Sequence, residues 1–294
     1  MRKRRFMQVD VFTNRAGYGN PLAVVLDADD LDTEQMQHFA AWTNLSETTF
    51  LLPPTQADAD YRVRIFTPRQ ELPFAGHPSV GTAWVAIDAG IVKPREGRLI
   101  QQCAAGLLDV RVETRADDTR THVRAPDARI RELPKPLHAQ LAAILSSTSV
   151  VDTRSSRLVN NGPEWLLAEL PDEQSVRRFA PPLAAIADLC VATRAVGLAI
   201  YARCHGADHR LVVRAFCPAD GIPEDPVTGS ANAAIAALLH SSRDLEQIGT
   251  CYRASQGREV GRDGVIDVTV DDRGQVWIGG DTVAAIEGTL NWPS

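Results

Sequence analysis

The stretch EDPVTGSANAAIAALL, Glu224 to Leu239, joins two acids and a proline to a Thr-Gly-Ser turn and then to an alanine-rich apolar run. Aspartate and proline favour the first residues of a helix, so the pattern predicts a helix here. A helix that is apolar on all sides is normally buried. In this stretch alone, helix capping is enough to explain the acids, and any role in binding has to be argued from the rest of the chain.

An earlier part of the chain repeats this pattern. VRIFTP at Val63–Pro68 returns as VRAFCP at Val213–Pro218, 150 residues later. HPSVGTAWVA, which begins at His77, lines up with DPVTGSANAA, which begins at Asp225, 148 residues later. Because these offsets are near half of the 294 residues, the repeat predicts a duplicated half-molecule in which His77 and Asp225 occupy equivalent places.

Composition is that of an ordinary globular protein, with 44% hydrophobic and 23% charged residues, and the length favours two domains. The net charge of -6 gives no reason to expect a nucleic-acid partner. The basic opening MRKRRF leads directly into a strand-like VDVF, so we expect no signal peptide, and no apolar run approaches the roughly 20 residues of a membrane helix. These features predict a cytoplasmic protein with no membrane partner.

Five cysteines are scattered without a CxxC pair, which argues against a disulfide framework and against a zinc site. Cys204 and His209 bracket the segment CHGADH, which we interpret as a polar surface loop because the close ligand pairs of zinc sites are missing. We therefore expect no metal.

Short alternating runs predict an α+β fold with a mixed, mostly antiparallel sheet. The predicted strands are Gln8–Phe12, Leu22–Leu26, Thr49–Leu52, Tyr61–Phe66, Leu107–Val112, Leu166–Leu170, Val196–Tyr201, Leu211–Phe216, Val265–Val270 and Val276–Gly279. Asp32 and Gln35 form a capping box for a helix that ends near Asn44. Pro78–Ala89 and Ser230–His240 are predicted as buried helices, and we expect sheet to wrap each of them.

The predicted domains are residues 1–128 and 129–279, with a tail of about 280–294 packing back on the first. The Pro- and charge-rich stretch Pro126–Pro136 is the expected crossing between them.

If the halves pack as pseudo-twins, their two loop-to-helix joins face each other across a cleft, where ligands commonly bind. Backbone N–H groups around Gly76 and Gly229, together with the helix dipoles, suit a carboxylate or phosphate. Glu47, His77 and Asp225 each have a simple structural explanation as a cap or a loop acid. Around one pocket, however, carboxylates and an imidazole can move a proton at neutral pH.

The motifs GNPLAVV, NLSETTF, RIFTP, ELPFAGHPSVGTA and EDPVTGSA occur in this order over nearly the whole chain. In this they resemble the PhzF family of phenazine-biosynthesis-like isomerases. The resemblance implies a diaminopimelate-epimerase-like fold of two pseudo-symmetric domains, each a curved, mostly antiparallel sheet wrapped around a central helix. It also implies a homodimer that uses no cofactor.

The resemblance further implies isomerisation of trans-2,3-dihydro-3-hydroxyanthranilate or an analogue, a small carboxylated substrate. Glu47 would be the general acid/base, and His77 and Asp225 would orient the substrate and assist its proton movements. The carboxylate or polar edge of the substrate would be held by Ser46, Gly76, Gly229 and Ser230. Amino-acid epimerases of this fold use two cysteines. The positions in this chain that resemble those cysteine sites carry Ala75 and Asp225, so a two-thiol racemase is disfavoured.

Two alternatives stay open. A serine hydrolase could use Ser46 or Ser230 with His77 and Asp225, although the GxSxG elbow of such enzymes is missing. A catalytically silent protein that only binds a small molecule could also keep this fold, but binding alone has no need of the base Glu47.

Overall fold

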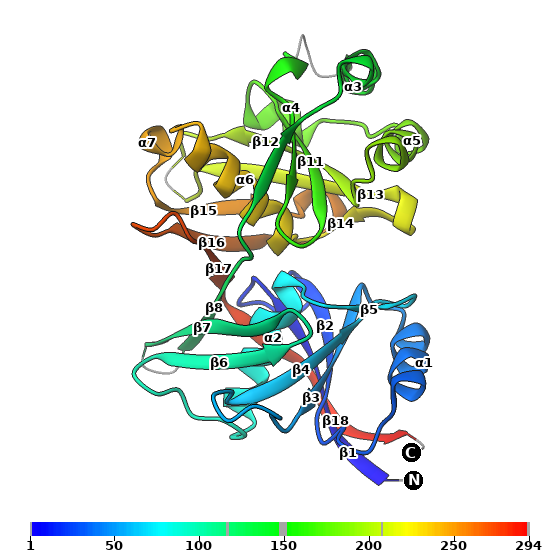
Figure 1. The fold of residues 1–294 in the computed structure, drawn as a ribbon, viewed down its shortest axis with the longest axis vertical. Helices are drawn as coiled ribbons and strands as arrows, with labels where there is room; N and C mark the ends of the chain where they lie inside the picture. The colour runs from blue at the N-terminus through cyan, green and yellow to red at the C-terminus, as the bar shows by residue number, and fades with distance from the viewer. Residues whose placement is uncertain (1, 116–117, 147–151, 207, 293–294) are drawn as a thin grey trace. The chain divides into compact units, whose positions relative to one another are not determined.

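The computed structural model describes residues 2–115, 118–146, 152–206 and 208–292. The chain divides into two compact units, which we call unit 1 (Met1–Arg124 and Gly279–Ser294) and unit 2 (Ala125–Ile278). Each unit combines a mixed sheet with helices (Figure 1). The C-terminal strand returns to unit 1 because it pairs with the first strand of the chain along its whole length.

Unit 1 is built on nine strands with two helices among the described residues. The strands are β1 (Arg2–Val11), β2 (Asn20–Val25), β3 (Glu47–Leu52), β4 (Tyr61–Phe66), β5 (Glu71–Leu72), β6 (Arg98–Cys103), β7 (Gly106–Arg115), β8 (Asp118–Arg124) and β18 (Thr282–Trp292). The helices are α1 (Thr33–Thr43) and α2 (Gly76–Asp88). In Figure 1, α2 lies among these strands, and it packs against β1, β2, β3, β4 and β8.

Unit 2 contains more helices than unit 1. Its strands are β9 (Arg129–Glu132), β10 (Arg157–Asn160), β11 (Glu164–Glu169), β12 (Gly197–Arg203), β13 (Leu211–Cys217), β14 (Ile222–Asp225), β15 (Cys251–Gln256), β16 (Gly264–Val270) and β17 (Val276–Gly280), whose last residues pass into unit 1. Its helices are α3 (His138–Leu145), α4 (Glu173–Arg177), α5 (Leu183–Thr193), α6 (Gly229–Ser241) and α7 (Leu245–Ile248). Helix α6 packs against β10, β11 and β16.

The strands of the two units pair in the same order. In unit 1, β1–β2 is antiparallel, β2–β3 parallel, β3–β4 antiparallel, β4–β6 parallel and β6–β7 antiparallel. The series β10, β11, β12, β13, β15 and β16 in unit 2 shows the same alternation. The topology thus agrees with the duplicated half-molecule that the sequence repeat predicts.

A bidentate ion pair marks the same place in both units. Arg64 donates to the two carboxylate oxygens of Glu71 at 2.7 and 2.6 Å, and Arg214 donates to those of Glu224 at 2.9 and 2.8 Å. Each guanidinium also lies 5.1 Å from the ring of the phenylalanine two residues further on. The arginine and the glutamate are 7 positions apart in unit 1 and 10 apart in unit 2. The connection between them is therefore longer in unit 2.

This longer connection corrects one prediction from the sequence. Ile65 pairs with Leu72 in unit 1, and the matching residue Ala215 pairs with Asp225 in unit 2. The equivalent of Asp225 is therefore Leu72 and not His77. Because α2 and α6 both begin at a glycine and both span 13 residues, His77 corresponds instead to Ser230. The sequence comparison aligned Pro78, which lies inside α2, with Pro226, which lies before α6. It did so because it did not allow for the longer loop in unit 2.

Local signals predicted several elements correctly. Asp32 accepts a hydrogen bond from the backbone of Gln35 and the Gln35 side chain accepts one in return, so the capping box is present, and α1 ends at the left-handed Asn44. The helices predicted at Pro78–Ala89 and Ser230–His240 are α2 and α6, and most of their residues are buried.

The proposed crossing at Pro126–Pro136 was wrong in part. Residues Arg129–Glu132 form β9, which pairs antiparallel with β10 and so belongs to the sheet of unit 2. No helix in the described part of the chain is long and apolar enough to cross a membrane.

Candidate active site

Glu47 is the first residue of β3 and follows the turn that ends α1. Its carboxylate Oε2 lies 3.6 Å from Nε2 of His77, and the Glu47 side chain is only 18% exposed. Strand β3 lies in the interior of the sheet of unit 1, between β2 and β4, so the backbone that carries Glu47 is fixed on both sides. The structure thus brings two of the predicted site residues together in unit 1.

The environment of Glu47 changes its proton affinity. Burial raises the pKa of Glu47 from about 4.5 to about 7, and a hydrogen bond with Ser46 opposes the rise. A buried carboxylate is disfavoured in its charged form because the low-dielectric surroundings replace water. At neutral pH Glu47 is therefore present in comparable amounts as acid and as base.

His77 is held in the first turn of α2. Its side chain is 6% exposed, and the helix begins after Ala75, which has extended backbone. No side chain among the described residues caps this N-terminus. The first N–H groups of a helix are otherwise without intrahelical partners, so this end of α2 is suited to a carboxylate.

Ser46 lies beside Glu47 and is linked to the core. Its hydroxyl donates to Oδ1 of Asn20 at 3.4 Å, and Asn20 is fully buried at the start of β2. Asn20 belongs to the GNP segment and was not singled out by the sequence analysis. Asn20 can hold Ser46 only because β2 pairs parallel with β3, and the sequence does not reveal this pairing.

In unit 2, a buried glutamine organises the predicted join. Gln256 accepts from the backbone N–H of Thr228 and from Asn232, each at 3.0 Å. It donates to the backbone oxygen of Asp225 at 3.1 Å and to the hydroxyl of Thr228 at 2.9 Å. The Thr228 hydroxyl in turn donates to the carboxylate of Asp225. The loop before α6 is therefore rigidly positioned, and its N-terminus also lacks a side-chain cap among the described residues.

Ser230 lies in the first turn of α6. Its hydroxyl accepts a hydrogen bond from the indole N–H of Trp165 at 3.1 Å, and its backbone oxygen accepts from Asn161 at 2.9 Å. Gly229 opens the helix directly before it and is buried. Trp165 and Asn161 come from the β10–β11 region, and no sequence motif pointed to them.

The two units differ at the position that carries the glutamate. Thr48 pairs with Phe66 in unit 1, and Leu198 pairs with Phe216 in unit 2, so the equivalent of Glu47 is Gly197. A Cβ atom on Gly197 would lie 2.6 Å from the ring of Trp165. The indole therefore takes up space in unit 2 that a side chain would need, and of these two matching positions only the one in unit 1 carries an acid.

The comparison of the helix starts also corrects the expected places of the epimerase cysteines. Ala75 and Thr228 are the residues that precede α2 and α6, so Thr228 and not Asp225 is the equivalent of Ala75. Neither is a cysteine, and the five free cysteines lie at other positions. A two-thiol racemase is still disfavoured after this correction, because neither corresponding position carries a cysteine.

Comparison with known proteins identifies the family. The family model described as phenazine biosynthesis-like protein, PhzC-PhzF, matches residues 9–288. The chain belongs to the PhzF family. A PhzF relative from Pseudomonas aeruginosa, trans-2,3-dihydro-3-hydroxyanthranilate isomerase, is 33% identical over 290 residues, which cover 97% of this chain and 98% of the relative. Antisense-enhancing sequence 1 of Schizosaccharomyces pombe is also 33% identical, over 98% of this chain and 99% of its own.

Solved structures agree with the family assignment. The Bacillus anthracis phenazine biosynthesis protein of the PhzF family superposes with a TM-score of 0.83 over 99% of this chain and 100% of its own, at 24% identity. This likeness confirms the predicted α+β, diaminopimelate-epimerase-like fold. Because several of its relatives, among them the Pseudomonas aeruginosa protein, are named isomerases, this PhzF-family chain is an isomerase.

Proposed function

We propose that this isomerase moves a proton between carbons of a small carboxylated substrate and that Glu47 is its general acid/base. The observation that supports the proposal most directly is the mostly buried carboxylate of Glu47, which lies 3.6 Å from His77 and has its pKa raised to about 7. A catalytic group with a pKa near the working pH can both remove and return a proton. The substrate class follows trans-2,3-dihydro-3-hydroxyanthranilate, on which the Pseudomonas aeruginosa relative acts according to its name.

The other predicted residues have supporting roles in the proposal. His77 lies against Glu47 and orients the reacting part of the substrate. Asp225 orients it through a carboxylate that is fixed by Thr228. In this proposal the negative edge of the substrate is held by the hydroxyl of Ser46 beside Glu47 and by N–H donors at the helix starts, Gly76 in α2 and Gly229 and Ser230 in α6.

Negative charge develops on the substrate when a proton leaves a carbon next to a conjugated carboxylate. Donors that are already in place stabilise this charge without reorganising. The network around Gln256 and the hydrogen bond from Trp165 to Ser230 keep the start of α6 in place. The homodimer, the cytoplasmic location and the lack of a nucleic-acid partner remain predictions from the sequence.

The test is to incubate the protein with trans-2,3-dihydro-3-hydroxyanthranilate in deuterated water and to follow both the ultraviolet spectrum and the proton NMR spectrum. We expect conversion with uptake of deuterium at carbon, and a loss of about 10²- to 10⁴-fold in Glu47→Gln. Glu34→Gln, which changes an exposed acid in α1, is the matched control and should keep the wild-type rate.

Conversion by Glu47→Gln at the wild-type rate would refute the role of Glu47. Wild-type protein that leaves this compound unchanged, in both spectra, would refute it as a substrate. The carboxylated analogues would then be screened by the same exchange measurement.

A further inference from the structure

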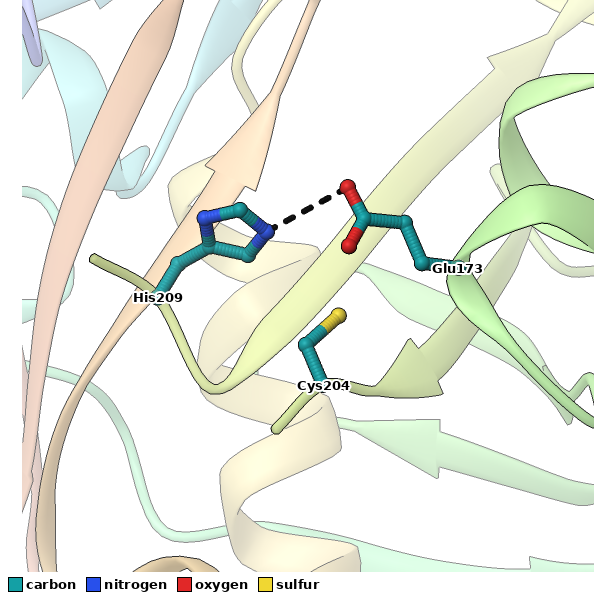
Figure 2. A group of neighbouring side chains, drawn as sticks. All are labelled: Glu173, Cys204 and His209. Carbon is teal, nitrogen blue, oxygen red and sulfur yellow. Dashed lines mark ion pairs between the residues drawn. The ribbon is translucent and has the colours of Figure 1, made fainter. Parts of the chain in front are cut away.

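Three side chains with metal-binding atoms meet in unit 2, as Figure 2 shows. Glu173 is the first residue of α4, Cys204 directly follows β12, and His209 lies two residues before β13. Their ligand atoms all lie within 4.8 Å of one another, and Nε2 of His209 is 3.4 Å from Oε1 of Glu173. The loop that carries Cys204 and His209 is closed by a hydrogen bond of 2.7 Å from the N–H of Cys204 to the oxygen of Arg210.

We propose that Glu173, Cys204 and His209 bind a divalent transition-metal ion, with zinc the preferred ion. Thiolate, imidazole and carboxylate are the groups that zinc selects in proteins, and three of them leave one position for water. With bonds of about 2.0 to 2.3 Å, the ligands of a tetrahedral zinc lie about 3.5 Å apart. Because the observed ligand atoms lie within 4.8 Å of one another, no pair has to move closer by more than about 1.3 Å, which side-chain rotation can supply.

His209 directs its Nε2 atom at Glu173. The atom is buried and makes no hydrogen bond to the residues that the structure describes, although it lies 3.4 Å from Oε1 of Glu173. Buried polar atoms nearly always have a hydrogen-bond partner. A metal ion bound between His209 and Glu173 would complete the bonding of this nitrogen.

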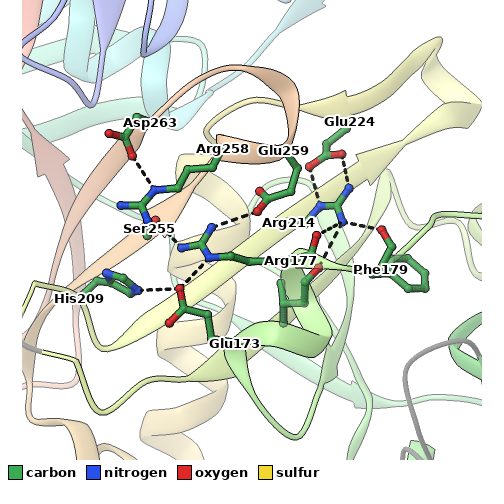
Figure 3. Close-up of polar contacts among 11 residues, drawn as sticks. Glu173, Arg177, Phe179, His209, Arg214, Glu224, Ser255, Arg258, Glu259 and Asp263 are labelled. Atoms are coloured by element: carbon green, nitrogen blue, oxygen red, sulfur yellow. Dashed lines mark hydrogen bonds and ion pairs between the residues drawn. The ribbon is translucent and has the colours of Figure 1, made fainter.

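The surrounding charges allow a dication here (Figure 3). Arg177 donates to Glu173 at 2.6 Å, to Glu259 at 3.0 Å and to Ser255 at 3.2 Å. Because Glu259 offsets the charge of Arg177, the charge of Glu173 is left to face the ion together with the thiolate of Cys204. Arg177 also fixes the orientation of the Glu173 carboxylate, as outer residues do in metal sites.

The site is open to solvent on one side. The Glu173 side chain is 38% exposed and provides a route by which an ion can enter.

The test uses the full-length protein, freed of metal by a chelator and titrated with Co²⁺. We expect about one ion per chain, the absorption bands of tetrahedral cobalt and a thiolate-to-cobalt charge-transfer band, all of which Zn²⁺ removes by displacement. Cys204→Ser should abolish the charge-transfer band, and His209→Gln should weaken Co²⁺ binding at least tenfold. Cys251→Ser, which changes the exposed cysteine of the same unit, is the matched control and should bind as the wild type does.

A wild-type protein that binds no Co²⁺, or a charge-transfer band that survives in Cys204→Ser, would overturn the proposal. Loss of the band in Cys251→Ser would do the same, because it would assign the thiolate to the exposed cysteine. Circular dichroism checks the fold of each variant. If Cys204→Ser does not fold, Glu173→Gln and His209→Gln decide the matter, since neither side chain is completely buried. The readout is metal binding, so the result is independent of the proposed isomerase activity.

Discussion

Nε2 of His77, at the start of α2, lies 3.6 Å from Oε2 of Glu47, at the start of β3. The two elements are separated in the chain by β4 and β5, so the contact exists only because α2 packs against the sheet. It is slightly longer than a hydrogen bond, and contacts of catalytic groups often shorten when a substrate binds. We therefore expect the ionisation of Glu47 to govern how the proposed activity and the stability respond to pH.

The rate should depend on the ionisation of Glu47. The base has to start deprotonated, and burial raises its pKa to about 7. We therefore expect kcat/KM to rise from about pH 5 and to level off above about pH 8, with an apparent pKa of about 7. Initial rates measured across this range at constant ionic strength check the prediction. A profile that is flat from about pH 5 upward would contradict it.

The ionisation of Glu47 should also affect the stability of the fold. Stability should fall as pH rises, whereas the rate should rise. Between the unfolded pKa of about 4.5 and the folded pKa of about 7, the folded state binds more protons than the unfolded state. Stability from this group is therefore complete below about pH 4.5 and is lost as pH rises to about 7, by at most about 3 kcal/mol. Glu47→Gln carries no charge, so its free energy of unfolding relative to the wild type should increase between about pH 5 and about pH 8. Urea denaturation at both pH values measures this difference, and an unchanged difference would refute it.

The two Arg–Glu pairs should differ in their contribution to stability. The side chains of Arg214 and Glu224 are 6% and 8% exposed, whereas those of Arg64 and Glu71 are 24% and 30% exposed. Glu224→Gln leaves a buried guanidinium without its counter-charge, so we expect a loss of about 3 to 5 kcal/mol. Glu71→Gln should cost about 1 kcal/mol or less. Equal losses in chemical denaturation would mean that burial does not set the strength of these pairs.

Gly197 should tolerate no side chain. A Cβ atom there would lie 2.5 Å from the backbone oxygen of Phe216 and 2.6 Å from the ring of Trp165. We expect Gly197→Ala to lower the free energy of unfolding by about 1 to 3 kcal/mol. Gly288→Ala is the matched control, because a Cβ atom at that position would have no described atom within 4 Å. Thermal denaturation of both variants compares them, and a wild-type Tm in Gly197→Ala would show that Trp165 moves aside at no cost.

Sequence signals that act within one turn were sufficient for part of the fold. The capping box of Asp32 and Gln35 involves neighbouring residues, and the apolar runs of α2 and α6 leave no polar face for solvent. Strands β6 and β8 were missed because they place polar side chains inside. Gln101 is fully buried and donates to Ser79, and Thr121 is fully buried and donates to the backbone of α2.

The sequence singled out candidate site residues, whose roles stay predictions, but it did not point to the residues that hold them in place. Glu47 and His77 belong to recognisable motifs, and the structure brings them together. Asn20, Trp165 and Gln256 act across long stretches of chain, so their partners depend on strand pairing. The equivalence of His77 with Asp225 failed for a related reason, because a longer loop shifts the comparison between the two halves.

The replacement of Glu47 by Gly197 in the second half has a stereochemical consequence. If Glu47 alone moves the proton, as we propose, its carboxyl group at the start of β3 reaches a flat conjugated substrate from one side, and we expect hydrogen to be removed and returned on the same face of the molecule. A suprafacial shift follows, and a deuterium label placed at the donor carbon should reappear in part at the acceptor carbon of the same molecule, diluted by exchange with solvent.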